Sequence, residues 1–523
     1  MAIKITYATL SADDPELHAA FDQAIERVTA EFGQTHPQYI GSEKRFGSAT
    51  FEDRSPIDTR ICLGHFQKGT RQDAKDAIAA ARAAFPAWSH LPYQERNKIL
   101  HRAGDLIHER VLDLSALVVI ETGKSRVEAM GEVEESADLI HWYAKMMEDN
   151  NGFVIKMGSY NPAKDENYSV LRPYGVWAVV APFNFPMALA VGPIAAALTM
   201  GNTVVFKCAS DTPYIGVKIQ EAFRDAGVPA GAINYITGGG GTVGAELVEN
   251  PGVDGITFTG SFDIGYHSVF KTFSKTYPKP VIVEMGGKNP AIVMPSADLD
   301  VAALGVTRAA FGLDGQKCSA CSRVYVHESI KDAFLQKLVE TTRRVAVVGD
   351  PRKKETFMGT VINQNAYNDY QRFMAKARAD GNVIYGGNVL TEGDFAHGYF
   401  VEPAIVVGLP EDHELVKQEL FVPILHVGTF KTLDEALDKA NNTEYGLTAG
   451  FFSKVEEEIQ TFFDRIEAGV TYVNRAAGAT TGAWPGIQTF GGWKASGSSG
   501  KNIGGPHTIQ LYGREQSRTR IIG

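Results

Sequence analysis

The sequence predicts an α/β fold with a doubly wound, mostly parallel sheet followed by a second α/β unit. From residue 176 onward, short uninterrupted apolar runs alternate with helical segments, as expected for strands that are covered on both faces. Gly286 and Gly287 separate two such series. The chain has 523 residues, whereas a single core stops growing near about 250–300 residues. We therefore expect more than one domain.

Each apolar run of suitable length is interpreted as a buried strand. The expected strands of the first series are 176–181, 203–207, 233–237, 255–259 and 281–284. Those of the second series are 291–294, 323–326, 405–407, 425–429 and 470–473. Helices are expected over 188–200, 329–345 and 433–441, and one is expected to begin near Pro213 because a proline costs least in the first turn.

The first 150 residues are expected to be mostly helical, apart from a strand-like patch near 38–40. Thr70 and Asp73 have the spacing of a capping box, and the apolar residues after them recur at helical spacing. Near the other end, residues 507–512 are strand-like and are expected to form an edge that pairs with another chain.

Composition and charge exclude several classes of protein. The 51 basic and 61 acidic residues give a net charge of −10 without a basic block, so we expect a small-molecule partner and no nucleic acid. Four cysteines are too few for a disulfide framework, and residues 1–7 lack the apolar region of a signal peptide. Both observations favour a reducing, cytoplasmic setting.

Residues 176–206 carry no charge and would be flagged as a membrane span by hydropathy alone. Pro182, Pro186 and Pro193 interrupt this stretch, and each removes a backbone donor that a bilayer could not replace. We therefore interpret it as strand, helix and strand, and expect no membrane association.

Cys318 and Cys321 stand three residues apart, just before an expected strand and close to Lys317 and Arg323. They could simply fill space in the core. A zinc site would need more ligands than His327 can add, so we expect no metal. A redox pair is possible in principle, whereas a nearby cation and a turn favour Cys318 as a nucleophile.

Three further features could carry chemistry. Glu284 ends an apolar strand, so it is either paired, for example with Lys288, or a base in a cleft. Asn184 follows another strand, at the edge where ligands bind in open α/β sheets, or it is an ordinary turn amide. The glycine-rich turn 238–244 could receive a phosphate, although its spacing differs from the usual dinucleotide fingerprint.

Taken together, these segments resemble the aldehyde dehydrogenase family, in order and from about residue 35 to the end. The motifs are Pro-Phe-Asn-Phe-Pro at 182–186, Phe-Thr-Gly-Ser at 258–261, Glu-Met-Gly-Gly-Lys at 284–288, Gly-Gln-Lys-Cys at 315–318, Glu-Leu-Phe-Val-Pro at 419–423 and Phe-Gly-Gly at 490–492. The resemblance implies a Rossmann-like NAD(P)-binding domain over 1–155 and 174–286, and an α/β catalytic domain over 287–486. It also implies a small β oligomerisation element over 156–173 and 500–523, and hence a homodimer or an assembly of dimers.

The resemblance also implies a mechanism. Cys318 would attack an aldehyde as a thiolate, and the side-chain amide of Asn184 with the backbone N–H of Cys318 would hold the oxyanion. After hydride transfer, Glu284 would draw a proton from the water that hydrolyses the thioester. Because relatives that transfer the acyl group to CoA typically lack this glutamate, its presence favours a free carboxylic acid as the product.

The cofactor implied by the family is NAD. The residues implied to contact it are Ala181, Pro182, Phe183, Lys207, Ser210, Gly241, Gly260, Ser261, Met285, Glu419 and Phe421. Family members that prefer NAD strictly often carry a glutamate where this chain has Ser210. A hydroxyl neither repels a 2′-phosphate nor requires a 2′-hydroxyl, so we expect NADP to be tolerated.

Within the family, the chain looks most like the group that oxidises glutamate semialdehyde (1-pyrroline-5-carboxylate). That resemblance implies substrate contacts from Phe185, Ser319, Gly482, Ala483 and Phe490, with Glu132 facing the ammonium. Charge-assisted hydrogen bonds would hold the α-carboxylate.

The chain departs from the group's pattern beside this carboxylate anchor. Residues 474–482 are about three residues longer than usual, Trp484 and Pro485 follow the anchor turn, and Thr489 replaces a common proline. Another semialdehyde or a larger aldehyde therefore stays open as the substrate. A catalytically silent structural protein of this fold, or a thiol-disulfide enzyme using Cys318 and Cys321, is the contrasting class.

Overall fold

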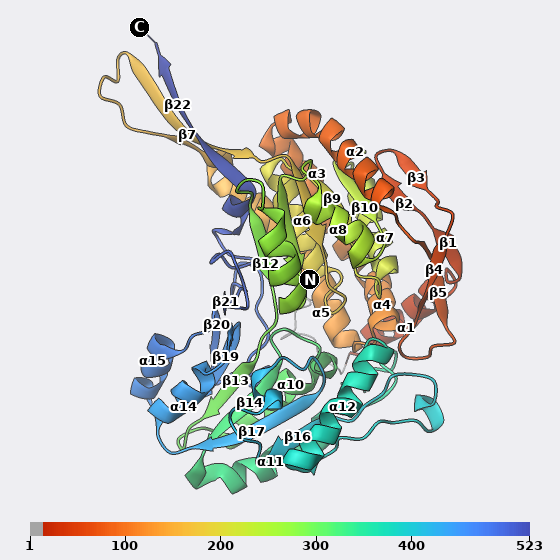
Figure 1. Ribbon diagram of the computed structural model, residues 1–523, viewed down its shortest axis with the longest axis vertical. Helices are drawn as coiled ribbons and strands as arrows, with labels where there is room; N and C mark the ends of the chain where they lie inside the picture. The colour runs from red at the N-terminus through yellow and green to blue at the C-terminus, as the bar shows by residue number, and fades with distance from the viewer. Residues whose placement is uncertain (1–13, 523) are drawn as a thin grey trace.

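The structure, a computed structural model, describes residues 14–522. Two α/β units lie one above the other in Figure 1, each with its own seven-stranded sheet, and a thin β arm projects from the upper unit. The predicted α/β class is confirmed. The expectation about a signal peptide concerns residues 1–7, which lie outside the described residues.

The upper unit is built on what we call the first sheet, with the strand order β12-β11-β8-β9-β10-β2-β3. Its parallel strands are β8 (Val176–Val180), β9 (Thr203–Lys207), β10 (Ile233–Ile236), β11 (Gly255–Thr259) and β12 (Val281–Glu284). β2 (Gln38–Ile40) and β3 (Glu43–Arg45) extend the sheet antiparallel. The five parallel strands agree with the expected ones to within one residue at each end, because strands buried on both faces carry uninterrupted apolar runs.

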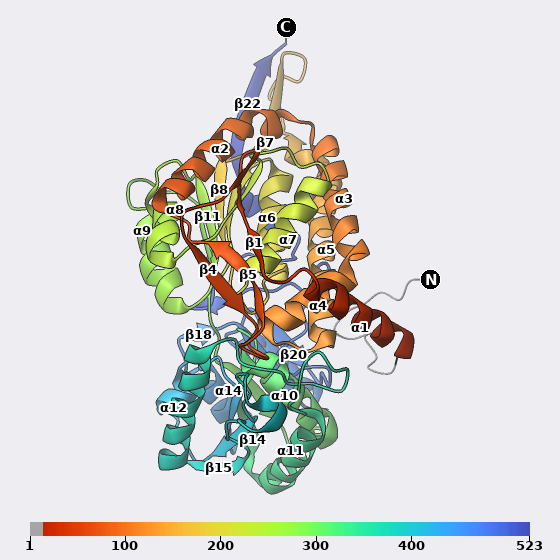
Figure 2. The same cartoon turned by 90° about the vertical axis from the view of Figure 1, so that its right-hand side faces the viewer.

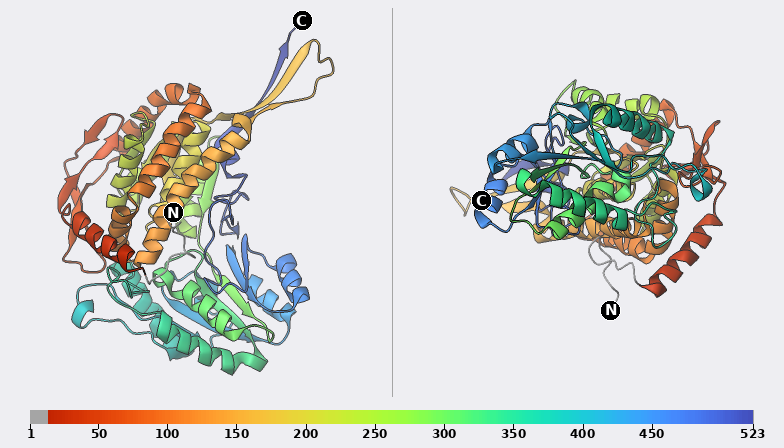
Figure 3. Two further views of the ribbon diagram at one scale, coloured as in Figure 1. Left: turned by 180° about the vertical axis from the view of Figure 1, so that it is seen from behind. Right: turned by 90° about the horizontal axis from the view of Figure 1, so that it is seen from below.

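Helices cover both faces of the first sheet. One face packs against α2 (Arg71–His90) and α8 (Ala245–Glu249). The other packs against α6 (Ala188–Met200) and α7 (Pro213–Asp225). α3 (Tyr93–Glu109), α4 (Val111–Thr122) and α5 (Arg126–Asp149) form a further layer on these two helices (orange to yellow-green in Figure 3). The capping box at Thr70 and Asp73 and the helix start at Pro213 are confirmed.

The uncharged stretch 176–206 forms β8, α6 and β9, as predicted. α6 has 13 residues, is buried along nearly its whole length and accommodates Pro193. In the part of the chain that the structure describes, no helix is both long and apolar enough to cross a bilayer.

The N-terminal region contains more strands than expected. A separate three-stranded sheet is formed by β1 (Gln34–His36), β5 (Cys62–Gln67) and β4 (Thr50–Arg54). Figure 2 shows this sheet in front, next to α1 (Pro15–Thr29). β4 alternates between exposed and covered positions and is rich in charged residues, so no continuous apolar run marks it in the sequence.

The lower unit is built on the second sheet, with the order β15-β16-β17-β14-β13-β19-β20. The strands are β13 (Asn289–Val293), β14 (Cys321–His327), β15 (Asn382–Tyr385), β16 (Ala404–Val407), β17 (Ile424–Phe430), β19 (Thr448–Phe452) and β20 (Val470–Val473). All are parallel except β15. The helices of this unit are α10 (Leu299–Phe311), α11 (Lys331–Val345), α12 (Gln364–Asp380), α13 (Glu414–Lys417), α14 (Leu433–Asn441) and α15 (Glu456–Arg465). The five expected strands are present; β15 and β19 were not predicted.

The projecting arm joins β6 (Val154–Lys156), β7 (Asp165–Pro173) and β22 (Gly513–Ile521) in one antiparallel sheet. β22 pairs with β7 over its whole length, from Gly513 opposite Pro173 to Ile521 opposite Asp165. The strand expected at 507–512 is wrong, because residues 508–512 form a 3-10 helix. Tyr512 is buried there against Trp177 of the first sheet, so the apolar pattern marks packing rather than a strand.

Candidate active site

The two sheets meet where β12 runs into β13 after only the four residues 285–288. The carboxyl ends of the first-sheet strands therefore face the amino ends of second-sheet strands. Glu284 is the last residue of β12, and Cys318 lies in the loop before β14. This junction brings together most of the residues that the sequence singled out.

Glu284 is enclosed at the end of β12 and is 5% exposed. Its Oε2 atom has no hydrogen-bond partner among the described residues. Burial raises the pKa of Glu284 to about 8, and a nearby backbone N–H of Gly492 opposes that rise. A carboxyl with a pKa near neutrality and a free oxygen can exchange protons, as a general base must.

Cys318 is half-buried in the loop before β14. Burial raises the pKa of its thiol to about 12, and the negative charges of Glu419 and Glu284 add to the rise, so both carboxylates must lie near the sulfur. The amide of Ser319 acts in the opposite direction. The thiol is thus protonated at neutral pH unless a base or a positive charge approaches it.

Asn184 lies in the turn between β8 and α6 and is 3% exposed. Its side-chain Nδ2 donates a hydrogen bond to the backbone carbonyl of Gln316 at 3.0 Å, two residues before Cys318. Gln316 is itself fixed, because its Oε1 accepts a hydrogen bond from the amide of Ile362 at 2.9 Å. An amide nitrogen carries two hydrogens, so one remains for an oxyanion beside the cysteine.

Glu419 approaches the β12–β13 junction from the segment before β17. Its Oε1 accepts a hydrogen bond from the amide of Gly287 at 3.0 Å, and a Cβ at Gly286 would come within 2.1 Å of the other oxygen. Burial raises the pKa of Glu419 to about 7. Phe421, with a φ of 58°, lies with its ring edge against the ring of Phe183, at 5.8 Å between centroids.

The predicted cofactor residues of the first sheet lie at the carboxyl ends of its strands. Lys207 ends β9, is 6% exposed and donates to the carbonyl of Cys208 at 3.0 Å, which leaves further N–H groups for a ligand. Burial lowers the pKa of Lys207. In the glycine-rich turn, a Cβ at Gly241 would meet nothing within 4 Å, so a phosphate would find open space.

The remaining predicted cofactor residues follow the same edge. Ala181 and Met285 are buried beside β8 and β12, and Gly260 and Ser261 directly follow β11. Ser210 is exposed, three residues after Lys207. The residues present therefore fit a dinucleotide that runs along the carboxyl edge of the first sheet.

The predicted carboxylate anchor is held by side chains that the sequence analysis did not single out. Thr480 Oγ1 donates to the carbonyl of Ser319 at 2.6 Å, which joins the anchor loop to the residue after the nucleophile. Arg475 donates to the carbonyls of Thr481 and Gly482, each at 3.2 Å. Gly482 has a φ of 110°, a conformation that favours glycine.

These contacts turn the backbone carbonyls of the anchor turn toward Arg475. The hydroxyl of Tyr472 lies beside Ala483 and close enough to Cys318 to interact electrostatically. Phe490 is fixed by backbone hydrogen bonds to Ile503 at 2.9 and 2.6 Å.

Glu132 is not placed as predicted. Its side chain is 0% exposed, pairs with the ammonium of Lys124 and accepts hydrogen bonds from the amides of Met187 and Ala188. An enclosed carboxylate that is already paired and hydrogen bonded is not available to a substrate ammonium. Sequence spacing could not reveal this, because Lys124 precedes α5 and its burial depends on the packing of α5 against α6.

A different carboxylate lies beside the nucleophile loop. Glu128 pairs with Lys317 and accepts a hydrogen bond from the amide of Leu313 at 2.9 Å. The two charged side chains are 13% and 10% exposed. Glu128 is one helical turn before Glu132 on α5. The spacing of four residues places both carboxylates on one face of the helix, and it is the sequence feature that could have indicated Glu128 as a site residue.

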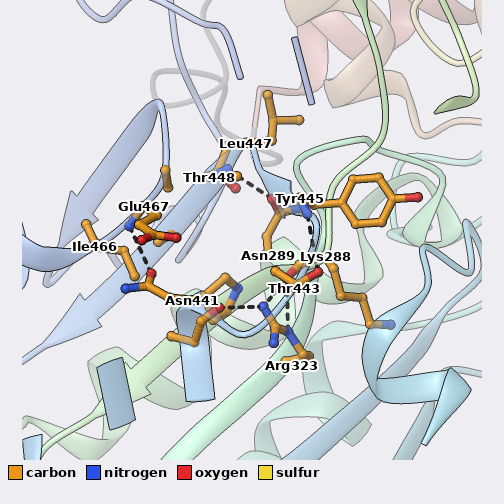
Figure 4. A pocket seen from close by; sticks show the side chains of 15 residues that line it. Lys288, Asn289, Arg323, Asn441, Thr443, Tyr445, Leu447, Thr448, Ile466 and Glu467 are labelled. Atoms are coloured by element: carbon orange, nitrogen blue, oxygen red, sulfur yellow. Dashed lines mark hydrogen bonds between the residues drawn. The ribbon is translucent and has the colours of Figure 1, made fainter. Parts of the chain in front are cut away.

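The pocket in Figure 4 lies on the second-sheet side of the junction, away from Cys318. Arg323 donates to the carbonyl of Lys288 at 2.6 and 2.9 Å and to that of Ala440 at 2.9 Å. The space there is about 10 Å³, roughly enough for one water molecule. This pocket is therefore not a substrate site. Its role is structural, because Arg323 holds the carbonyl of Lys288 at the end of the 285–288 connection.

With the fold and this geometry established, comparison with known proteins defines the class. Residues 44–517 match the model of the aldehyde dehydrogenase family, and the chain belongs to that family. It is 36% identical over 499 residues to the 1-pyrroline-5-carboxylate dehydrogenase of Geobacillus sp. strain WCH70, with 94% of each chain covered. The enzyme of the same name from Bacillus cytotoxicus is 36% identical over 513 residues, with 96% of each chain covered.

Solved structures agree with these relatives. The crystal structure of 1-pyrroline-5-carboxylate dehydrogenase from Thermus with bound NAD superposes with a TM-score of 0.92 at 32% identity, covering 98% of this chain and 97% of that one. A lactaldehyde dehydrogenase superposes with a TM-score of 0.86 at 31% identity, covering 93% and 99%. The resemblance recognised from the motifs is thereby confirmed at the level of the family.

Proposed function

We propose that the protein oxidises L-glutamate 5-semialdehyde, the open form of 1-pyrroline-5-carboxylate, to glutamate with NAD. The observation that carries this proposal is the anchor built around Ser319, Thr480 and Gly482, one residue from the nucleophile. The backbone amides of this turn and the Ser319 hydroxyl are suited to a carboxylate at the far end of a short chain. The names of the curated relatives support the same substrate.

In the proposed reaction, the Cys318 thiol releases its proton to water, the resulting thiolate adds to the aldehyde carbon, and the carbonyl electron pair moves onto oxygen. The amide of Asn184 and the backbone N–H of Cys318 stabilise that oxyanion. Preorganised donors of this kind contribute about 3–4 kcal/mol each in a site from which water is excluded. Loss of hydride from the same carbon leaves a thioester on Cys318.

Glu284 acts in the second half of the reaction. Its unpaired oxygen takes a proton from water, the water oxygen adds to the thioester carbon, and the Cys318 thiol leaves. A pKa of about 8 gives a fraction of carboxylate at neutral pH and still allows the proton to be released afterward. The product is a free carboxylate.

NAD, when bound, supplies the hydride acceptor. Lys207 and the turn after β10 would hold its adenosine and phosphate portion, and Glu419 would hold a ribose. Phe183 and Phe421 would exclude water from the ring next to Cys318. Tolerance of NADP is part of the proposal, since the exposed Ser210 places no charge near a 2′-phosphate.

We also propose that the arm of β6, β7 and β22 is an oligomerisation element, which supports a homodimer or an assembly of dimers in a cytoplasmic setting. β22 is exposed along almost its whole length, and apolar residues such as Ile155, Tyr160 and Ile521 are exposed on the arm. Exposed apolar groups on a projecting sheet are typical of a surface that another chain covers.

A panel of aldehydes tests the substrate. The measurement is kcat/KM with NAD for glutamate semialdehyde, succinate semialdehyde, and unsubstituted aliphatic and aromatic aldehydes. We expect glutamate semialdehyde to lead by at least about 10-fold, since a well-placed charge-assisted hydrogen bond contributes about 1.5–3 kcal/mol. Equal values across the panel would contradict the anchor, and a preference for a larger aldehyde would assign the longer 474–482 loop to another substrate.

A further inference from the structure

A buried ion pair lies directly behind the segment that carries Asn184 and Phe185. Lys124 follows α4 and Glu132 lies on α5, and both side chains are 0% exposed. Burial lowers the pKa of Lys124 and raises the pKa of Glu132, and each charge offsets this effect on the other. Because neither side chain reaches solvent, the pair acts on its protein neighbours.

Lys124 holds the first part of this segment. Its Nζ donates a hydrogen bond to the backbone carbonyl of Asn184 at 2.7 Å. The same ammonium lies 4.1 Å from the centre of the Phe185 ring, within the range of a cation–π interaction. One charge thus contacts both Asn184, the proposed oxyanion residue, and Phe185, which is expected to contact the substrate.

Glu132 holds the last part of the segment. Its Oε1 accepts hydrogen bonds from the amides of Met187 at 2.7 Å and Ala188 at 3.4 Å, and its Oε2 receives the Lys124 ammonium. These amides open α6, where a carboxylate is favoured by the helix dipole. The pair therefore connects the start of α6 to the carbonyl of Asn184.

We propose that Lys124 and Glu132 are positioning residues that fix the Asn184 amide, and with it the Phe185 ring, for the reaction at Cys318. The proposal rests on the role of Asn184 given under the proposed function. With its carbonyl held by Lys124 and its side chain held by the Gln316 carbonyl at 3.0 Å, Asn184 is fixed from two directions. Geometry matters here, since a displacement of about 1 Å can cost about 100-fold in rate.

A purely structural role does not explain the choice of charged groups. A buried ion pair is often no more stabilising than apolar side chains of the same volume, while removal of one partner leaves an uncompensated charge. Apolar side chains could fill the same space, but they could neither donate to the Asn184 carbonyl nor accept from the Met187 amide. The polar contacts, rather than the filling of space, distinguish this pair.

The test uses the full-length protein with glutamate semialdehyde and NAD. We expect Lys124→Met to lower kcat about 10- to 100-fold with a smaller change in KM, and Glu132→Gln to lower it less, because glutamine keeps an acceptor for the Met187 amide. The matched control is Arg126→Met on the same helix. Arg126 is also buried and pairs with Asp22, but it contacts the carbonyl of Arg352 rather than residues 184–188.

The control is expected to lower the melting temperature while leaving kcat within about 2-fold of the unmutated protein, since Arg126 does not contact residues 184–188. The double variant Lys124→Met/Glu132→Leu removes both charges and avoids an unpaired one. It is expected to recover the melting temperature without recovering kcat. Recovery of both, or full activity of Lys124→Met, would overturn the proposal.

A double-mutant cycle with Asn184→Ala separates this proposal from the one on which it rests. If Lys124 acts through Asn184, Lys124→Met lowers kcat much less when Asn184 is already alanine. Independent, multiplicative losses would contradict positioning through Asn184. If Asn184→Ala alone leaves kcat unchanged, the proposed oxyanion role fails, whatever Lys124→Met does.

Discussion

The first and second sheets contribute to the site from opposite ends of their strands. In the first sheet, Lys207 and Glu284 are the last residues of β9 and β12. In the second, Cys318 and Glu419 precede β14 and β17. Because residues 285–288 connect β12 to β13 without a crossover helix, the carboxyl edge of one sheet faces the amino edge of the other.

This difference between the two sheets shows which site residues the rule for ligand sites in α/β sheets can predict and which it cannot. Ligands in open α/β sheets bind outside the carboxyl ends of strands, and this rule locates Asn184, Lys207 and Glu284. It does not locate Cys318 or Glu419, which reach the site from loops that lead into strands. Division of the site between two edges also predicts that substitutions on the two sides have different kinetic effects.

The largest effect is expected on the second-sheet side. Cys318→Ser removes the sulfur that forms every covalent species, so kcat/KM should fall at least about 10³-fold in a steady-state NADH assay. The matched change Cys321→Ser should stay within about 3-fold, because that thiol is buried and directed at the carbonyl of Arg323 at 3.5 Å. Loss of activity in Cys321→Ser would favour a thiol-disulfide enzyme instead.

On the first-sheet side, Glu284→Gln should block hydrolysis while leaving acylation possible. We expect a burst of one NADH per active site in stopped flow, followed by turnover about 10²-fold slower or more. Only the carboxylate accepts a proton, so hydrolysis by the unmutated protein should accelerate as pH rises through about 8 and then level off. A burst that is absent, or a pH profile unchanged in Glu284→Gln, would place the base elsewhere.

A smaller effect is expected at Gly482, in the anchor turn of the loop that follows β20. Gly482→Ala places a Cβ about 2.3 Å from Nη2 of Arg475 and strains the backbone at a φ of 110°, so either the anchor turn or the guanidinium that holds it must shift. KM for glutamate semialdehyde should rise about 10- to 100-fold, from the loss of one or two charge-assisted hydrogen bonds. Propionaldehyde, which has no carboxylate, serves as the control substrate, and an equal loss for it would show general damage to the site.

The smallest effect is expected at Ser210, which is exposed near the carboxyl end of β9, where the cofactor is proposed to bind. The unmutated protein should reduce NADP, and Ser210→Glu should lower the ratio of kcat/KM for NADP to that for NAD about 10-fold by placing a negative charge near a 2′-phosphate. Ser210→Ala is the neutral control and should leave the ratio unchanged. No reduction of NADP by the unmutated protein would contradict this interpretation of Ser210.

Much of the fold could be predicted because buried parallel strands leave a local signal. β9, β11, β12 and β20 have the predicted bounds, since each is an apolar or small-residue run with at most one charged residue, at its end. β7 and β22 leave no such signal. Both strands are polar, β22 is largely exposed and β7 is mostly half-buried, and they form because residues about 350 positions apart pair with each other.

The residues of the candidate site also fall into those that the sequence reveals and those that it does not. Cys318, Glu284 and Asn184 stand out because polar residues interrupt apolar or glycine-rich segments, and their order resembles a known family. Lys124 and Arg475 do not stand out, because a lysine before a helix and an arginine after a strand are ordinary in sequence. Their importance follows from backbone carbonyls that only the folded chain brings to them.

The short connection 285–288 is fastened on both sides by Ser496, whose carbonyl accepts from the amide of Met285 and whose hydroxyl donates to the carbonyl of Gly286. The loop 474–482 contacts the nucleophile loop through the hydrogen bond from Thr480 to the carbonyl of Ser319. A change in the length of that loop would alter the substrate anchor and leave Cys318 and Glu284 in place, whereas a single residue inserted into 285–288 would separate the base from the sulfur.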